Sequence, residues 1–235
     1  MGRHFEVRAK AMAATAAKKS ALYMRASKEI YMAARAGVPD PANNLALRAA
    51  VDKWKGQSVP RDVLDRAIKK AAGGEAENYI EGRYEAFGPG GSLLVVDTLT
   101  DNVNRALSEV RTAITRKGGH LGSVLYNFFD AGILVFEGTN KPNIEESLIL
   151  GDVDLREINE DEGIITVIVS PSDFTKAKEV LAGLGITEFE TCEITLLASE
   201  EIELTDPEEL RKFNELVDAL DELQDVQAVH HNVKQ

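Results

Sequence analysis

The sequence is poor in the residues that build metal centres and disulfides. Its 235 residues include one cysteine, Cys192, and four histidines. A single cysteine excludes an internal disulfide and any multi-cysteine zinc or iron–sulfur site. The adjacent His230 and His231 fall on opposite faces of an expected strand, so they cannot chelate one ion together. We therefore expect neither a metal nor a cofactor.

Aromatic residues and long apolar runs are also scarce. Aromatics make up 6% of the chain, which argues against wide base-stacking platforms. The longest apolar runs, at 93–96 and 133–136, have the length of strands, far below the ~18–20 residues of a membrane span. The N-terminus has no apolar segment of the secretory type. We expect a cytoplasmic protein that does not enter a membrane.

Catalytic motifs are missing as well. The run Phe87-Gly88-Pro89-Gly90-Gly91 precedes an expected strand, whereas a phosphate-binding loop would follow a strand and open a helix. Cys192 alternates with polar residues and is expected to be a small core residue, not a nucleophile. The carboxylates stand in charged runs typical of a solvated surface. The sequence thus predicts no enzyme and no small-molecule substrate.

Charge is divided unevenly along the chain, whose net charge is −12. Residues 1–74 hold 15 Lys or Arg and 6 Asp or Glu, a net charge of +9. Residues 75–235 hold 12 Lys or Arg and 33 Asp or Glu, a net charge of −21. Such a division indicates a basic module that meets polyanions, carried on an acidic body. A helical domain can also carry Lys and Arg merely on solvated faces, and charge alone leaves both interpretations open.

The basic part reads as a small helical bundle. Residues 6–36 are rich in Ala, Lys, Arg and Met and lack Gly and Pro, which favours a helix. At helical spacing Lys18, Arg25, Lys28 and Arg35 share one face, opposite an apolar one. A second helix is expected at 43–55 and a third from Pro60 to the glycines at 73–74, followed by a linker at 75–83.

Beyond residue 83 the pattern alternates between strand and helix periods. Strands are expected at 93–96, 124–129, 133–136, 153–158, 164–169, 187–197 and 226–229, with a hairpin through 130–132. Helices are expected after Asp101, over 143–150, after Ser170 and after Asp206. The order fits two α/β-sandwich modules, so the fold class is α+β: a helical bundle followed by two such modules.

Several contiguous segments carry a resemblance to a known family. They are LRAAVDK (47–53), VPRDVLDRAIKK (59–70), YEAFGPGG (84–91), LTDNVNR (99–105), KGGHLG (117–122) and ALDELQDVQAVHHN (219–232). The chain resembles the YebC family, which includes the mitochondrial translational activator of cytochrome c oxidase, and its start resembles the family's Met-Gly-Arg subgroup. The resemblance implies an N-terminal helical domain (1–79), a ferredoxin-like domain (80–130 plus 205–235) and a third domain inserted in the second (131–204).

The resemblance also implies a function. The family is held to regulate gene expression without catalysing a reaction, and many members are labelled probable DNA-binding transcriptional regulators. Other members look like translation factors that act on the ribosome where proline runs stall synthesis. We therefore expect a regulator that binds DNA or ribosomal RNA through its N-terminal domain. A protein–protein adaptor is a further alternative.

Two sets of basic residues are expected to contact phosphate. The first set is Arg3, Arg8, Lys10, Lys18, Lys19, Arg25, Lys28 and Arg35. The second set, on the third helix, is Arg61, Arg66, Lys69 and Lys70, of which Arg66 and Lys69 have an acidic residue four positions earlier, Asp62 and Asp65. Reversing Lys18, Arg25 and Lys28 to Glu is then expected to abolish nucleic-acid binding and to leave folding intact.

Overall fold

The computed structural model describes residues 16–73 and 77–234 and has the expected α+β class. Its described residues form two compact units. The larger unit holds residues 16–51, 59–129 and 197–234, and the smaller unit holds 52–58 and 130–196. Each unit contains one four-stranded sheet. No described helix has both the length and the apolar character that crossing a membrane requires.

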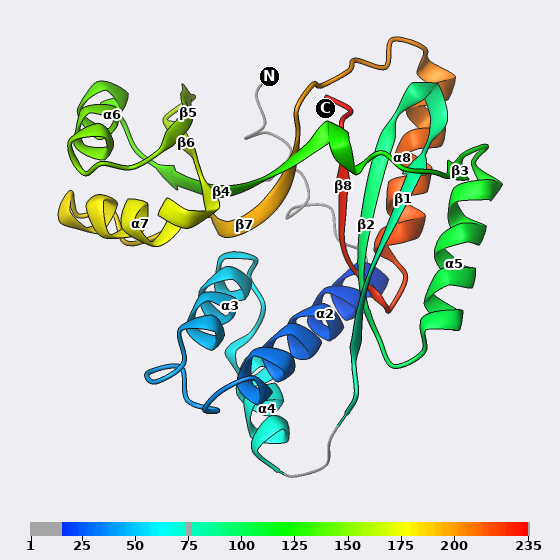
Figure 1. Cartoon of the computed structure of the whole chain (residues 1–235), viewed down its shortest axis with the longest axis horizontal. Coiled ribbons are helices and arrows are strands. Elements are labelled where there is room, and N and C mark those ends of the chain that lie inside the picture. The colour runs from blue at the N-terminus through cyan, green and yellow to red at the C-terminus, as the bar shows by residue number, and fades with distance from the viewer. Residues whose placement is uncertain (1–15, 74–76, 235) are drawn as a thin grey trace. The chain divides into compact units, whose positions relative to one another are not determined.

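Three helices follow one another in the N-terminal part: α2 (Ala16–Arg35), α3 (Leu45–Gly56) and α4 (Arg61–Ala72) (Figure 1). Asn44 fixes the turn between the first two. Its side-chain oxygen accepts from the Leu47 amide, and its amide group donates to the Ala33 carbonyl. This arrangement confirms the three predicted helices, although the stretch 6–15 of the first lies outside the described residues.

The sheet of the larger unit is antiparallel, in the order β3-β1-β2-β8. Its strands are β1 (Ile80–Phe87), β2 (Leu93–Thr100), β3 (His120–Leu121) and β8 (Val226–His231). Helices α5 (Val103–Arg116) and α8 (Pro207–Asp221) cover one face (Figure 1). Side chains such as Val96, Ile114 and Phe213 form the core between helices and sheet. Asn102 and Asp206 cap the two helices, as the sequence predicts.

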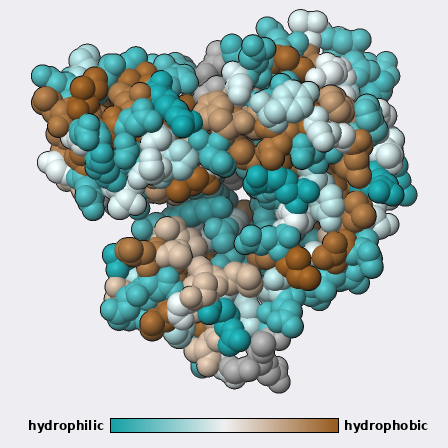
Figure 2. All heavy atoms as spheres, viewed as in Figure 1, coloured by the Kyte–Doolittle hydropathy of each residue, from teal (hydrophilic) through white to brown (hydrophobic). Residues whose placement is uncertain are grey.

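The smaller unit repeats this design with a sheet in the order β5-β6-β4-β7. Its strands are β4 (Phe128–Glu137), β5 (Leu155–Asp161), β6 (Ile164–Val169) and β7 (Thr191–Ala198), and its helices are α6 (Lys141–Leu150) and α7 (Phe174–Gly183). Figure 2 shows apolar surface over the part of the molecule that holds these helices. Ile149 and Leu150, at the end of α6, are 60% and 79% exposed.

In the described part of the chain, three short 3₁₀ helices complete the elements: Pro89–Gly91, Leu125–Asn127 and Pro171–Asp173. All strands of the second sheet lie, in sequence, between β3 and β8 of the first. That order agrees with one α/β module inserted in another. The exact domain boundaries given above stay a prediction.

Three local expectations are wrong. Residues 80–83 belong to β1 and not to a linker; the sequence missed them because this first half of the strand is mostly exposed and has no apolar alternation. No hairpin forms at 130–132: β4 runs straight through Gly132, where a Cβ would lie 2.6 Å from the Phe174 ring. Cys192 is half-buried and packs against the core of the smaller unit from its edge, so it is not a buried core residue.

The segment 117–122 folds tightly onto the end of β1. His120 pairs with Phe87 across the two strands, and their rings stack with centroids 5.1 Å apart at 20°. Glycine permits this approach, since a Cβ at Gly122 would lie 2.7 Å from the Phe87 ring and one at Gly119 2.5 Å from the Phe87 carbonyl. The loop therefore presents His120 in a fixed position.

Gly122→Ala is expected to lower the free energy of unfolding by about 1–3 kcal/mol, because the added methyl overpacks the Phe87 ring. Urea unfolding measures the change. The matched control is Gly183→Ala, where no atom lies within 4 Å of the added Cβ. It should be neutral or slightly stabilising, as Ala is the better helix former. Equal effects of the two variants would contradict this account of the loop.

Candidate nucleic-acid interface

Helix α2 has a buried side that carries two basic residues; this side is called the basic stripe. Ala21, Arg25 and Lys28 recur at i, i+4 and i+7, so they lie on one side of the helix. All three are buried, with Arg25 9% and Lys28 8% exposed. Buried cations need partners, since isolated charges are costly to remove from water. The structure supplies those partners from the end of α8 and the turn that follows it.

The Lys28 ammonium group has three acceptors. Its Nζ donates to Oδ1 of Asp225 and to the carbonyl oxygens of Leu99 and Gln224, each at 2.9 Å. The same group lies 5.5 Å from the centre of the Tyr79 ring, a cation–π distance. Because an ammonium has three protons, every one of them is satisfied without water.

Asp225, 2% exposed, is the acidic centre of this cluster. Its Oδ2 accepts from the Thr100 hydroxyl at 2.8 Å and from Arg105 Nε and Nη2 at 2.9 and 2.7 Å. Burial raises the pKa of this carboxyl, but the hydrogen bonds from Lys28, Arg105 and Thr100 outweigh it and hold the pKa below its ordinary 3.8. The carboxylate thus ties α2, β2 and α5 to the start of β8.

Two further ion pairs continue along α2 with increasing exposure. Arg25 binds Asp221 through the side-chain oxygen at 3.4 Å and also through the carbonyl oxygen. Burial lowers the pKa of Arg25, and Asp221 partly compensates. Lys18 binds Asp218 at 2.5 Å, with the two side chains 28% and 59% exposed.

These contacts correct part of the sequence prediction. Arg25 and Lys28 do not lie on an exposed phosphate-binding face, because carboxylates of the same chain already cover them. Lys28→Glu would place a second carboxylate beside the buried Asp225, so folding would not stay intact. Asp225 and Arg105 are partners that sequence reasoning missed. The sequence held one signal that this side of α2 is buried: the small residue Ala21 lies on the basic stripe and permits close packing there.

The second predicted set is exposed on α4. This helix buries Val63, Leu64, Ala67 and Ala71, and its opposite face presents the basic residues Arg61, Arg66, Lys69 and Lys70. The Arg61 and Arg66 side chains are 84% and 73% exposed.

Acidic side chains lie among these cations. Arg66 pairs with Asp62 at 2.7 Å, Arg61 with Asp65 at 3.6 Å and Lys70 with Glu77 at 2.6 Å. Lys69 has no ion-pair partner among residues 16–73 and 77–234. Such exposed pairs are weak and open readily to other anions.

The remaining candidates divide into two groups. Lys19 and Arg35 are exposed on α2. Arg3, Arg8 and Lys10 lie outside the described residues. The structure thus brings together four candidates on α4 and leaves two more exposed on α2. Within the described stretches, no group of three or more His, Cys, Asp or Glu could hold a metal ion.

Comparison with protein families covers nearly the whole chain. Residues 3–74 match the model of the TACO1/YebC protein N-terminal domain, and residues 79–233 match that of the TACO1/YebC second and third domain. The chain belongs to the TACO1/YebC family. The match confirms the resemblance to this family.

Relatives of this TACO1/YebC chain are named as regulators. A probable transcriptional regulatory protein of Mesoplasma florum is 46% identical over 234 residues, 99% of both chains. YeeN of Escherichia coli K12, which has the same description, is 45% identical over 217 residues, 91% of both chains. A crystal structure of a conserved hypothetical protein from Aquifex aeolicus matches with a TM-score of 0.78 and 33% identity, covering 93% of this chain and 91% of that one.

Lys28→Met is expected to lower the free energy of unfolding by about 3 kcal/mol, because among the described residues it leaves Arg105 as the one cation paired with the buried Asp225. Thermal or urea unfolding measures the change. Lys69→Met, on the exposed face of α4, is the matched control and should change stability by less than about 0.5 kcal/mol. A Lys28→Met variant as stable as the control would refute the structural role of Lys28.

Stability should also depend on pH through Asp225. Since its pKa is lowered in the folded state, the carboxylate stabilises the fold above its ordinary pKa of 3.8, and this contribution is lost as the pH falls through the lowered value. Melting temperatures measured between pH 5 and acid should fall more steeply for the natural chain than for Asp225→Asn. Parallel curves of melting temperature against pH for the two chains would contradict a stabilising role of the Asp225 carboxylate.

Proposed function

We propose that this protein is a non-catalytic regulator of gene expression that binds nucleic acid through the exposed basic face of its N-terminal helices. The observation that carries the proposal is the face of α4, where Arg61, Arg66, Lys69 and Lys70 project into solvent. The names of the relatives, probable transcriptional regulatory proteins, support a regulatory role. Lys19 and Arg35 of α2 add exposed positive charge.

The proposed contacts are to phosphate and not to base edges. Phosphate contacts position a protein, whereas base contacts specify a sequence. On α4 the acidic Asp62 and Asp65 lie among the cations and pair with Arg66 and Arg61, in exposed pairs that a phosphate can displace. Carboxylates beside these arginines do not match the fixed, bidentate arrangement in which arginine reads a guanine edge. The face is therefore suited to a phosphate backbone of defined shape.

The mixture of basic and acidic side chains on α4 favours a second candidate function, a translation factor that binds ribosomal RNA. Structured RNA is recognised largely by shape and backbone contacts. The alternative is thus a ribosome-associated factor that relieves stalling at proline runs, as the family resemblance implies.

A parallel titration separates the two candidates. The purified chain is titrated with ribosomes and with random duplex DNA, from low salt to physiological salt. Binding to ribosomes that survives physiological salt, together with loss of DNA binding, would establish the translation factor. Retention on DNA with a sequence preference, and none on ribosomes, would establish the transcriptional regulator.

Neutralising the face of α4 should weaken binding to the preferred partner. Arg66→Gln with Lys69→Gln is expected to reduce affinity about tenfold and to lower the slope of log affinity against log salt by about 1.4–1.8. Fluorescence anisotropy measures both quantities. The control, Lys141→Gln with Lys234→Gln, removes the same charge outside the N-terminal helices. Equal losses for the two double variants would reduce the effect to net charge and overturn the assignment to α4.

A further inference from the structure

One segment of the acidic part of the chain is positively charged. Residues 75–235 have a net charge of −21, yet residues 103–122 contain four basic residues and one acidic residue, a net charge of +3. The segment comprises α5 and the loop that leads into β3. Since most of the surrounding sequence repels anions, a local reversal of sign marks a place where an anion can be received.

The solvent face of α5 is polar and cationic along its length. Asn104, Ser108, Arg111 and Thr115 recur at i, i+4, i+7 and i+11, which places them in one stripe, and all four are exposed. At 1.5 Å per residue the stripe is about 16 Å long, enough for two or three successive phosphates of an extended strand. Amide, hydroxyl and guanidinium groups are the side chains that contact phosphate and sugar in nucleic-acid complexes.

Only some cations of the segment are available. Arg105 is bound to Asp225 and Asp101, and Lys117 to Glu215. By contrast, Arg111 and Arg116 are exposed, and neither has an ion-pair partner within the described part of the chain. The single acidic residue, Glu109, is half-buried. The two arginines therefore give the face its positive charge.

The threonine hydroxyl groups on this helix have their protons bound within the helix. Thr112 and Thr115 donate their protons to the carbonyls of Ser108 and Arg111, four residues back, at 2.7 and 2.9 Å. Their oxygens then face solvent as acceptors, because a hydroxyl has one proton and two lone pairs. A 2′-hydroxyl group can donate to such an acceptor, whereas DNA has no donor at that position.

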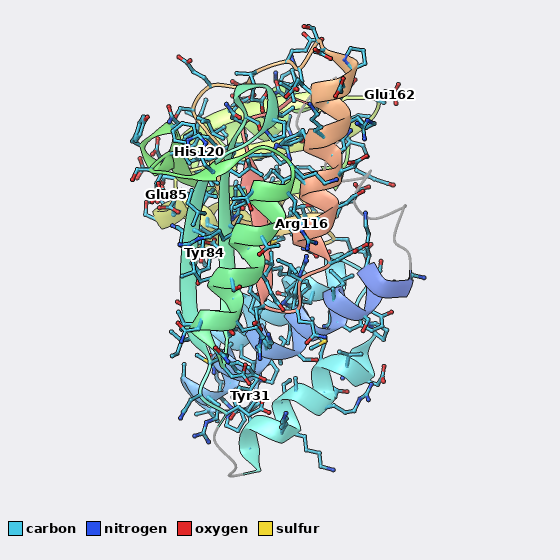
Figure 3. The ribbon with its side chains drawn as sticks, turned by 90° about the vertical axis from the view of Figure 1, so that its right-hand side faces the viewer. Tyr31, Tyr84, Glu85, Arg116, His120 and Glu162 are labelled. Atoms are coloured by element: carbon cyan, nitrogen blue, oxygen red, sulfur yellow. The ribbon has the colours of Figure 1, made fainter. Side chains whose placement is uncertain are left out.

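An exposed ring lies at the end of the same helix. His120 is exposed, and one face of its ring rests on Phe87, with centroids 5.1 Å apart. Figure 3, which looks onto α5, shows Arg116 and His120 towards the same end of this helix. A ring held from behind with an open outer face is suited to stack on an unpaired base.

We propose that the outer face of α5, with His120 at its end, binds single-stranded RNA: Arg111 and Arg116 contact phosphates, the threonine oxygens accept from ribose, and one unpaired base stacks on His120. This face is separate from the one on α4. The inference rests on the proposed function only in that the ligand is a nucleic acid, and it adds a second contact surface outside the N-terminal helices.

The test measures binding of a fluorescein-labelled 20-nucleotide oligouridylate to the full chain by anisotropy, across a salt series. Arg111→Gln with Arg116→Gln is expected to weaken binding about tenfold at physiological salt and to lower the salt slope by about 1.4, since each contact to a single strand contributes about 0.7. The control, Lys141→Gln with Lys234→Gln, should change binding less than twofold. Equal losses for the two double variants would overturn the proposal.

His120 has a different signature. His120→Ala is expected to weaken binding about tenfold and to leave the salt slope unchanged, because stacking releases no counterions. His120→Phe keeps a ring on Phe87 and should restore binding to within about threefold. A His120→Ala variant that binds as tightly as the natural chain, or a Phe variant no better than Ala, would overturn the stacking role. Oligodeoxythymidylate should bind several-fold more weakly than the RNA, and equal binding would overturn the role of the threonine oxygens.

The outcomes separate this inference from the proposed function. If the α4 double variant weakens RNA binding and the α5 double variant does not, the inference fails and the N-terminal assignment stands. If only the α5 double variant weakens RNA binding, the inference on α5 stands and the assignment to the N-terminal helices fails. A natural chain that binds no oligonucleotide at any salt concentration would overturn the inference on α5.

Discussion

The buried ion pair between Lys28 and Asp225 holds the larger unit together. It joins a helix near the N-terminus to the turn before the last strand, 197 residues away in sequence. Two buried charges are stable only when their hydrogen bonds are complete, and here three acceptors surround Lys28 while Thr100, Arg105 and Lys28 surround Asp225. The hydrogen bonds also fix how α2 is placed against the turn before β8, because they form in one relative orientation, whereas an apolar contact allows several.

This pair changes the meaning of the charge division. Part of the positive excess of residues 1–74 is used inside the protein, against Asp218, Asp221 and Asp225. The basic N-terminal part and the acidic body are therefore complementary to each other as well as to outside partners. Among the predicted phosphate contacts that fall within the described residues, those on α4 and at the ends of α2 stay exposed. On the inference above, α5 supplies a second surface within the acidic part.

The sequence predicted the fold class, the N-terminal helices and most strands, because apolar periodicity and the caps Asn102 and Asp206 are local signals. It failed at the start of β1, where mostly exposed residues give no apolar pattern, and at Gly132, where a close approach by Phe174 and not a turn requires glycine. It also failed for Arg25 and Lys28. A basic stripe on a helix looks the same whether it faces water or distant carboxylates, and only the fold brings Asp221 and Asp225 to it.

The central claim is that α2 uses its cations to hold the fold while α4 offers its cations to nucleic acid. Lysine footprinting by an amine-reactive reagent, read by mass spectrometry with and without bound nucleic acid, tests it most directly. The account predicts that Lys28 reacts slowly in both states, and that Lys69 and Lys70 react rapidly in the free chain and become protected on binding. Rapid reaction of Lys28 in the free chain, followed by protection on binding with Lys69 and Lys70 unchanged, would contradict it.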